Sequence, residues 1–411
     1  MLRHGNETVL ARVSQGIPAA GGRKGGFAAL RLLALLAGIA IVALMPAVGS
    51  PAGPLPATAG GNDPLFRRWE TVGTAEGLPS EKVFAVLADE DRIWAGTDKG
   101  LALLEGDDVR VFGMEDGLPF PVITALAVSP VTGDLWIGTM GGLARLSGGR
   151  IDSFTQLDSG LVNDVVYGVA VDGPDVWVAT AAGLSSYDTR TGGWEIFDTS
   201  NTLMHEPWCY AVTTDAGQVY VAVWGGGVIV RDGRTGQFRE HRDPDGELEI
   251  DLFRDDGLVH DITSAIAVSA DTMWVGTYFG LSRYAGRRWQ SYNQDDSGLA
   301  SDFINFVKAD GDAVWIATDQ GLSRFDAQTW HTWRRRADGS GIELQITGPD
   351  GAARSTLLAT GPASDMIYGI DLEHGDIWLA TAAGLSHGIA ADRPTETSIP
   401  KTAVNEGVRR W

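Results

Sequence analysis

Short runs in which apolar and polar residues alternate cover most of the chain, and Gly, Asn, Asp or Ser residues separate these runs. This pattern is typical of β-strands joined by tight turns. In one representative stretch it predicts four strands, at residues 165–171, 175–180, 183–187 and 194–197. Four short strands within about 40 residues are typical of one blade of a β-propeller.

One pattern ends the second strand of each such unit and leads into the third. It consists of an aromatic residue, two small or apolar residues, and then, in most units, Thr-x-x-Gly-Leu. The aromatic residue recurs seven times, at Trp94, Trp136, Trp177, Tyr220, Trp274, Trp315 and Trp378. Successive members are 42, 41, 43, 54, 41 and 63 residues apart. A strand-rich repeat near 40 residues indicates a propeller, so we predict an all-β fold with seven four-stranded blades.

The repeated residues have structural explanations. A Gly at the end of Thr-x-x-Gly adopts the left-handed backbone that a tight hairpin turn requires. A Trp at the aromatic position fills the wedge between two twisted sheets. We therefore expect the six repeated Trp residues to pack between neighbouring blades and to contribute little to specificity.

The two ends of the repeat array predict how the ring closes. The seventh repeat has no outer strand after Leu385, whereas residues 66–72 have the outer-strand pattern and precede the first inner strand. We expect this N-terminal strand to complete the last blade, which removes two exposed sheet edges. The propeller then spans residues 66–390, and residues 391–411 form a C-terminal tail.

The repeat also resembles a known family. Gly77-Leu-Pro-Ser80 followed by Ile93-Trp-Ala-Gly-Thr97-x-x-Gly-Leu101 is similar to the two-component regulator propeller repeat, and the similarity extends over residues 66–387. The resemblance implies an extracytoplasmic sensor domain of the kind attached to bacterial hybrid histidine kinases. Too few residues follow Trp378 for a kinase or response-regulator domain, so we expect no phosphotransfer by this chain. A separate sensor kinase is one partner that the resemblance suggests.

The N-terminal region indicates export. Residues 1–31 carry all of the Lys and Arg side chains of the first 60 residues, residues 32–49 are apolar and uncharged, and residues 50–65 are rich in Pro, Gly and Ala. Basic residues before an apolar segment place the rest of the chain outside the cytoplasm. We predict an apolar helix over residues 32–49, which is either an inner-membrane anchor or the core of a cleaved signal peptide. Residues 50–65 would form a flexible tether.

Composition excludes several functions. The net charge of −21 disfavours nucleic-acid binding, because an acidic surface repels phosphate. Cys209 is the sole cysteine, so the chain has no internal disulfide and no thiolate metal cluster. The sequence contains no nucleophile elbow, zinc-protease motif or phosphate-binding loop. We therefore expect no catalytic residues, no bound metal and no cofactor.

Specificity is expected where the repeat is broken. Six exceptional side chains fall in neighbouring turns and loops of the fourth and fifth repeats: His205, Trp208, Trp224, His260, Tyr278 and Phe279. We expect them to meet on the face that carries the loops between blades and the Thr-x-x-Gly turns, called the loop face below. Aromatic and imidazole groups there would suit a sugar ring or a peptide. The alternative is that they provide only local packing.

Two further features belong to the same face. Insertions at residues 240–256 and 341–358 are expected to enlarge it, the second as an extra hairpin. A column of acids precedes six of the inner strands: Glu81, Asp164, Glu206, Asp261, Asp302 and Asp365. These carboxylates would either hold a cation or accept hydrogen bonds from their own turns.

The sequence therefore predicts a periplasmic propeller, anchored to the inner membrane or secreted after signal cleavage. We expect it to bind a glycan, a peptide or an extracytoplasmic protein on the loop face, in sensing or in assembly. The alternative is a lyase or hydrolase that uses His205, His260 and nearby carboxylates.

Overall fold

The computed structural model describes residues 65–245, 255–326 and 328–390. The expectations for residues 1–31, 32–49, 50–64 and 391–411 lie outside the described residues. Within the described ranges, no helix has the length and apolar character needed to cross a bilayer.

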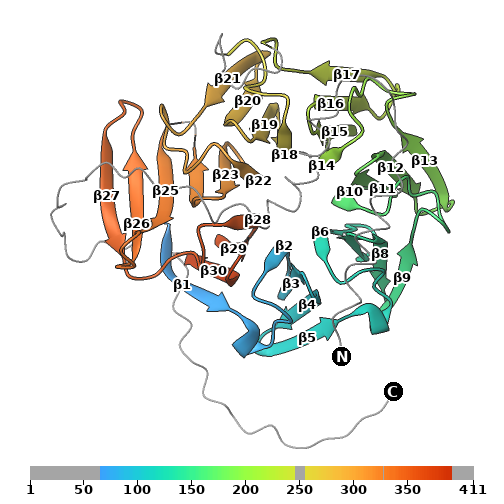
Figure 1. Cartoon of the computed structure of the whole chain (residues 1–411), viewed down its shortest axis with the longest axis horizontal. Helices are drawn as coiled ribbons and strands as arrows, with labels where there is room; N and C mark the ends of the chain where they lie inside the picture. Colours follow the sequence, from blue (N-terminus) through green and yellow to red (C-terminus); the bar gives the residue numbers. More distant parts are fainter. Residues whose placement is uncertain (1–64, 246–254, 327, 391–411) are drawn as a thin grey trace, which may run out of the picture. The chain divides into compact units, whose positions relative to one another are not determined.

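Seven antiparallel sheets surround one axis, and the strand that begins each sequence repeat is innermost (Figure 1). Blade one comprises β2 (Val83–Asp89), β3 (Arg92–Thr97), β4 (Gly100–Glu105) and β5 (Asp108–Phe112). Blade two comprises β6 (Ile123–Val128), β7 (Leu135–Thr139), β8 (Gly142–Ser147) and β9 (Arg150–Phe154). Blade three comprises β10 (Val166–Asp172), β11 (Asp175–Thr180), β12 (Gly183–Asp188) and β13 (Gly193–Phe197). The four strands predicted at residues 165–197 are thus confirmed.

The remaining blades follow in chain order. Blade four comprises β14 (Cys209–Asp215), β15 (Gln218–Val223), β16 (Gly227–Asp232) and β17 (Phe238–His241). Blade five comprises β18 (Thr263–Ser269), β19 (Thr272–Thr277), β20 (Leu281–Ala285) and β21 (Arg288–Tyr292). Blade six begins with β22 (Ile304–Asp310), β23 (Ala313–Thr318), β24 (Leu322–Phe325) and β25 (Trp330–Arg335). Blade seven contains β28 (Ile367–Glu373), β29 (Asp376–Thr381) and β30 (Gly384–Ala390). Two 3₁₀ turns, η2 (Thr74–Glu76) and η3 (Met114–Asp116), lie in loops between blades.

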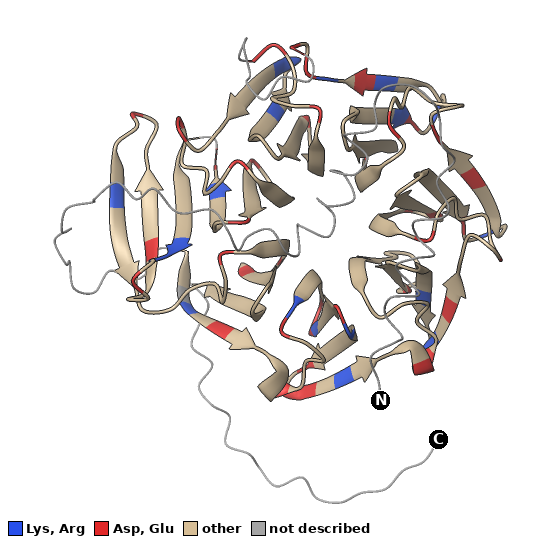
Figure 2. Cartoon of the chain, in the orientation of Figure 1, with Lys and Arg blue, Asp and Glu red and all other residues tan. Residues whose placement is uncertain are grey.

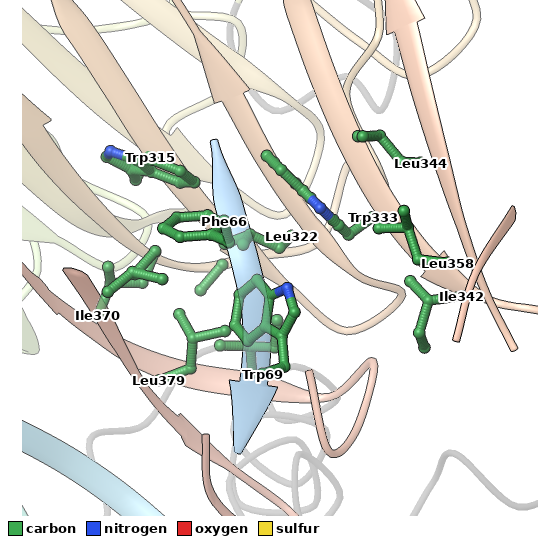
Figure 3. Close-up of a cluster of buried hydrophobic side chains, with 13 residues drawn as sticks. Phe66, Trp69, Trp315, Leu322, Trp333, Ile342, Leu344, Leu358, Ile370 and Leu379 are labelled. Carbon is green, nitrogen blue, oxygen red and sulfur yellow. The ribbon is translucent and has the colours of Figure 1, made fainter. Parts of the chain in front are cut away.

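The N-terminal strand closes the ring as predicted. β1 (Phe66–Val72) pairs antiparallel with β30 and becomes the outer strand of blade seven. Phe66 and Trp69 are buried against Trp315 and Trp333 of blade six (Figure 3). The rings of Phe66 and Trp69 meet edge to face, with centroids 4.9 Å apart. The closing strand thus joins the core shared by blades six and seven.

The repeated Trp residues lie between blades, which confirms their structural role. Each packs with apolar residues of the following blade, as Trp94 does with Ile123 and Ile137 of blade two. Five of the six are buried. Trp378 is half-buried and stacks on His387, with ring centroids 3.8 Å apart. These residues therefore hold the blades together.

The second insertion forms the expected hairpin, but its predicted position was wrong. β26 (Ile342–Thr347) pairs with β25, and β27 (Ala353–Leu358) pairs with β26, so blade six has six strands. The hairpin continues the sheet outward from the ring (Figure 1) and does not enlarge the loop face. The physical reason is that β25 offered a free edge. In addition, Ile342, Leu344 and Leu358 bury apolar surface in the core that contains Phe66 and Trp69 (Figure 3).

Candidate functional site

The Thr-x-x-Gly turn has one local geometry in six blades. In blade three the hydroxyl of Thr180 donates to the carbonyl of Gly183 at 2.7 Å and accepts from the amide of Ala182 at 3.2 Å. Gly183 has φ +132°, and a Cβ atom there would lie 2.6 Å from the carbonyl oxygen of Phe197. The Thr therefore fixes the turn, and only Gly fits its end.

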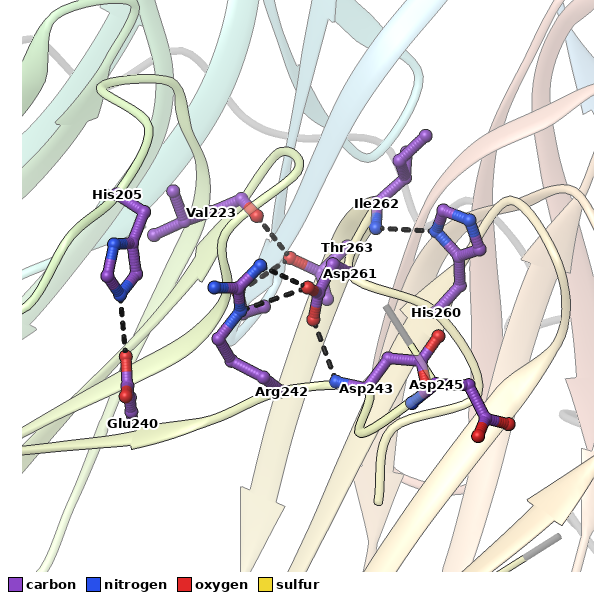
Figure 4. A network of polar contacts seen from close by, with 11 residues as sticks. His205, Val223, Glu240, Arg242, Asp243, Asp245, His260, Asp261, Ile262 and Thr263 are labelled. Carbon is purple, nitrogen blue, oxygen red and sulfur yellow. Dashed lines mark hydrogen bonds and ion pairs between the residues drawn. The ribbon is translucent and has the colours of Figure 1, made fainter. Parts of the chain in front are cut away.

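Blade four breaks this rule and compensates from its neighbour. Val223 stands where the other blades have Thr, so the turn has no hydroxyl of its own. Thr263, the first residue of β18 in blade five, donates instead to the carbonyls of Val223 and Gly227, at 3.0 and 2.9 Å (Figure 4). The other six inner strands begin with an apolar residue. The exceptional turn of blade four is thus completed by an exceptional residue of blade five.

This turn carries Trp224, which lies at the centre of a row of aromatic rings. The Trp224 side chain is only 8% exposed. It stacks on Tyr210 with centroids 4.8 Å apart and meets Tyr278 edge to face at 4.6 Å. Tyr210 also stacks on Tyr167, at 4.6 Å, and Tyr278 on Phe303, at 3.5 Å. We call Tyr167, Tyr210, Trp224, Tyr278 and Phe303 the aromatic ladder; it connects blades three to six.

Tyr167, Tyr210 and Phe303 are not among the site residues predicted from the sequence. The two tyrosines occupy the second position of the innermost strands, where the register with the second strand shifts. The same position in all seven blades holds Phe84, Thr124, Tyr167, Tyr210, Ser264, Asn305 and Tyr368. Its polar members bind the next blade, as Thr124 does by donating to the carbonyl of Val166 at 2.7 Å. An alignment of the inner strands alone would have revealed this variable column.

The polar groups of the ladder remain uncharged. Burial is the main cause that raises the pKa of Tyr167, Tyr210 and Tyr278. Nearby Tyr210 and Asp319 raise the pKa of Tyr278 further. Among the described residues, none of the three phenol hydroxyls has a hydrogen-bond partner. The ladder thus combines aromatic faces with neutral hydroxyls that can donate or accept a hydrogen bond.

Trp208, His260 and Phe279 lie next to the ladder. The carbonyl of Trp208 accepts from the amide of Trp224 at 2.9 Å. His260 is buried and stacks on Phe279, with centroids 4.1 Å apart. Its Nδ1 accepts from the amide of Ile262 at 2.9 Å (Figure 4). The His260 ring is therefore held in place by its own loop and by blade five.

His205 lies elsewhere. Its side chain is 57% exposed, and its Nε2 lies 3.2 Å from Oε2 of Glu240 on β17, the outer strand of blade four. Figure 4 shows this pair on the opposite side of Arg242 and Asp261 from His260. Within the described residues, no hydrogen bond, ion pair or ring contact joins His205 to the other five candidates. The structure thus associates Trp208, Trp224, Tyr278 with the ladder, places His260 and Phe279 beside it, and separates His205.

The acid column satisfies backbone amides. Glu81, Asp164, Asp261, Asp302 and Asp365 accept from the amides of Thr74, Gln156, Asp243, Gln294 and Arg335 respectively, all at or just after the preceding outer strand. These five carboxylates thus accept from backbone amides, as one of the two alternatives predicts, but from the start of the loop between blades and not from a turn next to the acid. No group of three or more His, Cys, Asp or Glu with metal-site geometry occurs in the described ranges.

The second insertion lies wholly, and the first for the most part, between such an amide and its acid. The paired residues are 8 positions apart in the loop of Gln294 and Asp302. They are 18 apart for Asp243 and Asp261, and 30 apart for Arg335 and Asp365. Asp365 therefore binds the end of β25 across the whole hairpin.

A surface cavity of about 550 Å³ lies away from the ladder, on the outer strands of blade five. Its lining carries both signs of charge, with Asp255, Asp256, Arg283, Arg287 and Arg288 beside Trp289. Acids of the propeller are spread over all blades and loops (Figure 2). The cavity is thus one mixed-charge region on an acidic surface.

Comparison with solved structures identifies the same architecture in other proteins. The extracellular domain of the putative hybrid two-component system BT3049 from B. thetaiotaomicron matches with a TM-score of 0.58 and 17% identity, over 78% of this chain and 41% of that one. The corresponding domain of BT4673 matches with a TM-score of 0.58 and 18% identity, over 78% and 39%. The chain shares the propeller fold of these extracellular domains. It spans about two-fifths of their length.

A propeller of another class has the same fold. Virginiamycin B lyase from Staphylococcus aureus, in selenomethionine-substituted form, matches with a TM-score of 0.54 and 12% identity, over 78% of this chain and 97% of the lyase. At these identities the likeness establishes a shared fold. No protein-family model and no curated protein matches the chain.

Proposed function

We propose that this propeller is an extracytoplasmic binding module that takes a ligand or partner on the loop face, over the aromatic ladder. The observation that carries the proposal is the ladder itself. Five aromatic side chains from four blades are in contact, and three of them have hydroxyls without a partner among the described residues. The other blades place small, apolar or acidic residues at the matching turn positions.

The chemistry of the ladder suits a glycan or a peptide. Aromatic faces stack on sugar rings and on apolar side chains, and neutral phenols select for polar groups of the ligand. The same fold in extracellular domains of putative hybrid two-component systems supports a role in sensing. Attachment to the inner membrane through residues 32–49, or release after cleavage there, and a separate kinase as partner belong to the same proposal.

The alternative, a lyase or hydrolase, would require His205 and His260 to act on one substrate. His205 is paired with Glu240 at the outer strand of blade four, and His260 stacks on Phe279 beside the ladder. This geometry favours the binding module.

The test compares Trp224→Ala and Tyr278→Phe with Met140→Ala, which alters the same turn position in blade two. The full-length protein is titrated with a panel of soluble oligosaccharides and peptides, and contact is detected by saturation-transfer NMR. We expect about tenfold weaker binding for Trp224→Ala, since a lost ring contact of about 1.4 kcal/mol corresponds to tenfold. Met140→Ala should bind normally. Unchanged binding by folded Trp224→Ala and Tyr278→Phe would show that the site is elsewhere.

A further inference from the structure

A carboxylate ends the aromatic ladder in blade six. Asp319 occupies the turn position that Trp224 and Tyr278 occupy in blades four and five. Its amide donates to the carbonyl of Phe303, the last ring of the ladder, at 3.3 Å. The backbone therefore fixes Asp319 beside Phe303, and through it beside Tyr278.

This carboxylate lacks a complete set of partners. Its Oδ1 atom is buried and has no hydrogen-bond partner among the described residues. Burial raises the pKa of Asp319, and contacts with uncharged Ser301 and Gln320 offset part of that effect. No basic side chain of the described ranges forms an ion pair with it. A buried acceptor left in this state is a site that a donor from outside the protein can satisfy.

The tyrosines extend this acceptor into a larger site. Tyr278 contacts Trp224 and stacks on Phe303, whose carbonyl accepts from the Asp319 amide. Burial raises the pKa of Tyr278, and Tyr210, Asp319 and Tyr167 raise it further. Phenol oxygens accept hydrogen bonds from N–H donors, and the faces of Tyr and Trp attract cations. The net charge of −21 raises the local concentration of cations around the protein.

We propose that Asp319 and the aromatic ladder bind an organic cation, an ammonium or guanidinium group carried by the ligand. This inference rests on the proposed function, because the ladder is the proposed site. A cation supplies both the N–H donors that the Asp319 carboxylate lacks and the charge that the ring faces attract. A neutral ligand would supply only the first.

Blade one provides a matched control. Asp98 occupies the same turn position, and its Oδ1 is also buried without a partner among the described residues. Its amide donates to the carbonyl of Lys82, and no ladder ring lies in that blade. Asp319→Asn and Asp98→Asn therefore remove equal charge from equivalent turns, only one of which adjoins the ladder.

The test uses two probes of equal shape, N-acetyl-arginine amide and its uncharged analogue N-acetyl-citrulline amide. Each is titrated into the full-length protein at about 150 mM salt, which screens general attraction to the acidic surface, and binding is followed by ligand-observed NMR. We expect the arginine probe to bind at least tenfold more tightly than the citrulline probe. Asp319→Asn should lose this preference, Tyr278→Phe should weaken it several-fold, and Asp98→Asn should retain it.

Equal binding of the two probes would overturn the proposal, as would equal losses in Asp319→Asn and Asp98→Asn. Failure of the cation site is distinguishable from failure of the proposed function. If a neutral oligosaccharide or peptide binds and Trp224→Ala weakens it while neither probe binds, the ladder is a binding site for uncharged ligands. If neither the probes nor any panel ligand contacts the ladder, both proposals fail.

Discussion

Thr263→Val tests whether one blade completes the turn of its neighbour. The substitution keeps the shape of a fully buried side chain and removes only the hydroxyl. That hydroxyl donates to the carbonyls of Val223 and Gly227. The Val223 carbonyl also accepts from the amide of Gly226 at 2.9 Å, so it keeps one partner.

The expected loss follows from these contacts. One buried donor disappears and the Gly227 carbonyl loses the hydroxyl that the other blades supply within the turn. A net hydrogen bond contributes about 1 kcal/mol, and an unsatisfied buried acceptor adds about 1–3 kcal/mol. We therefore expect Thr263→Val to lower the free energy of unfolding by about 2 kcal/mol.

A double-mutant cycle makes the test specific. Val223→Thr restores the hydroxyl that six other blades have, so it should recover at least about 1 kcal/mol in the Thr263→Val background. Thr180→Val, which removes the same hydroxyl within blade three, calibrates the loss. All variants are compared by equilibrium denaturation in urea. A loss below about 0.5 kcal/mol, or Val223→Thr and Thr263→Val effects that simply add, would refute completion of the turn by the neighbouring blade.

Two further substitutions test the Thr-x-x-Gly turn and the buried carboxylate of Asp319. Gly183→Ala should lower the free energy of unfolding by about 2–5 kcal/mol in urea denaturation, because it adds backbone strain and a clash with the Phe197 carbonyl. Gly106→Ala, at φ +61° with open space around it, should lower it by only about 1 kcal/mol. Equal losses for the two variants would contradict the clash. Asp319→Asn should leave the protein as stable as the unsubstituted protein at pH 7, or more stable. Burial raises the pKa of Asp319 in the folded state. Stability is therefore lost as the pH rises from the pKa of the unfolded state through that of the folded state, and the asparagine of the variant does not ionise. The difference from the unsubstituted protein should vanish near pH 3.5, and a variant less stable than Asp98→Asn at pH 7 would contradict this.

The fold followed from the sequence because the repeated residues have local causes. Trp at the aromatic position packs between blades, and Gly at the end of the turn adopts the left-handed backbone. Because the pattern occurs seven times, it is recognisable despite its exceptions. Closure by residues 66–72 followed from counting strands. The placement of the hairpin could not be predicted in this way, because the sequence indicates two strands but does not indicate which sheet edge they pair with.

The site residues that could be predicted are those that depart from the repeat. Trp224, Tyr278 and Phe279 stood out against bland turn residues, and two of them belong to the ladder. Tyr167 and Tyr210 were missed because an aromatic residue in an inner strand resembles ordinary core. Only the shifted register at that position directs them toward their neighbours. His205 was grouped with His260 by loop position, yet a loop carries side chains both toward the axis and toward the rim.

The amide-to-acid contacts have a consequence for engineering. Each contact joins the two ends of one interval of the loop between blades, and the chain already carries intervals of very different length without losing it. Foreign segments grafted into this interval of the five loops that have the contact should therefore be tolerated, since the flanking residues remain hydrogen-bonded to each other. The loop of Gln294 and Asp302, whose paired residues are only 8 positions apart, is an acceptor site for such grafts.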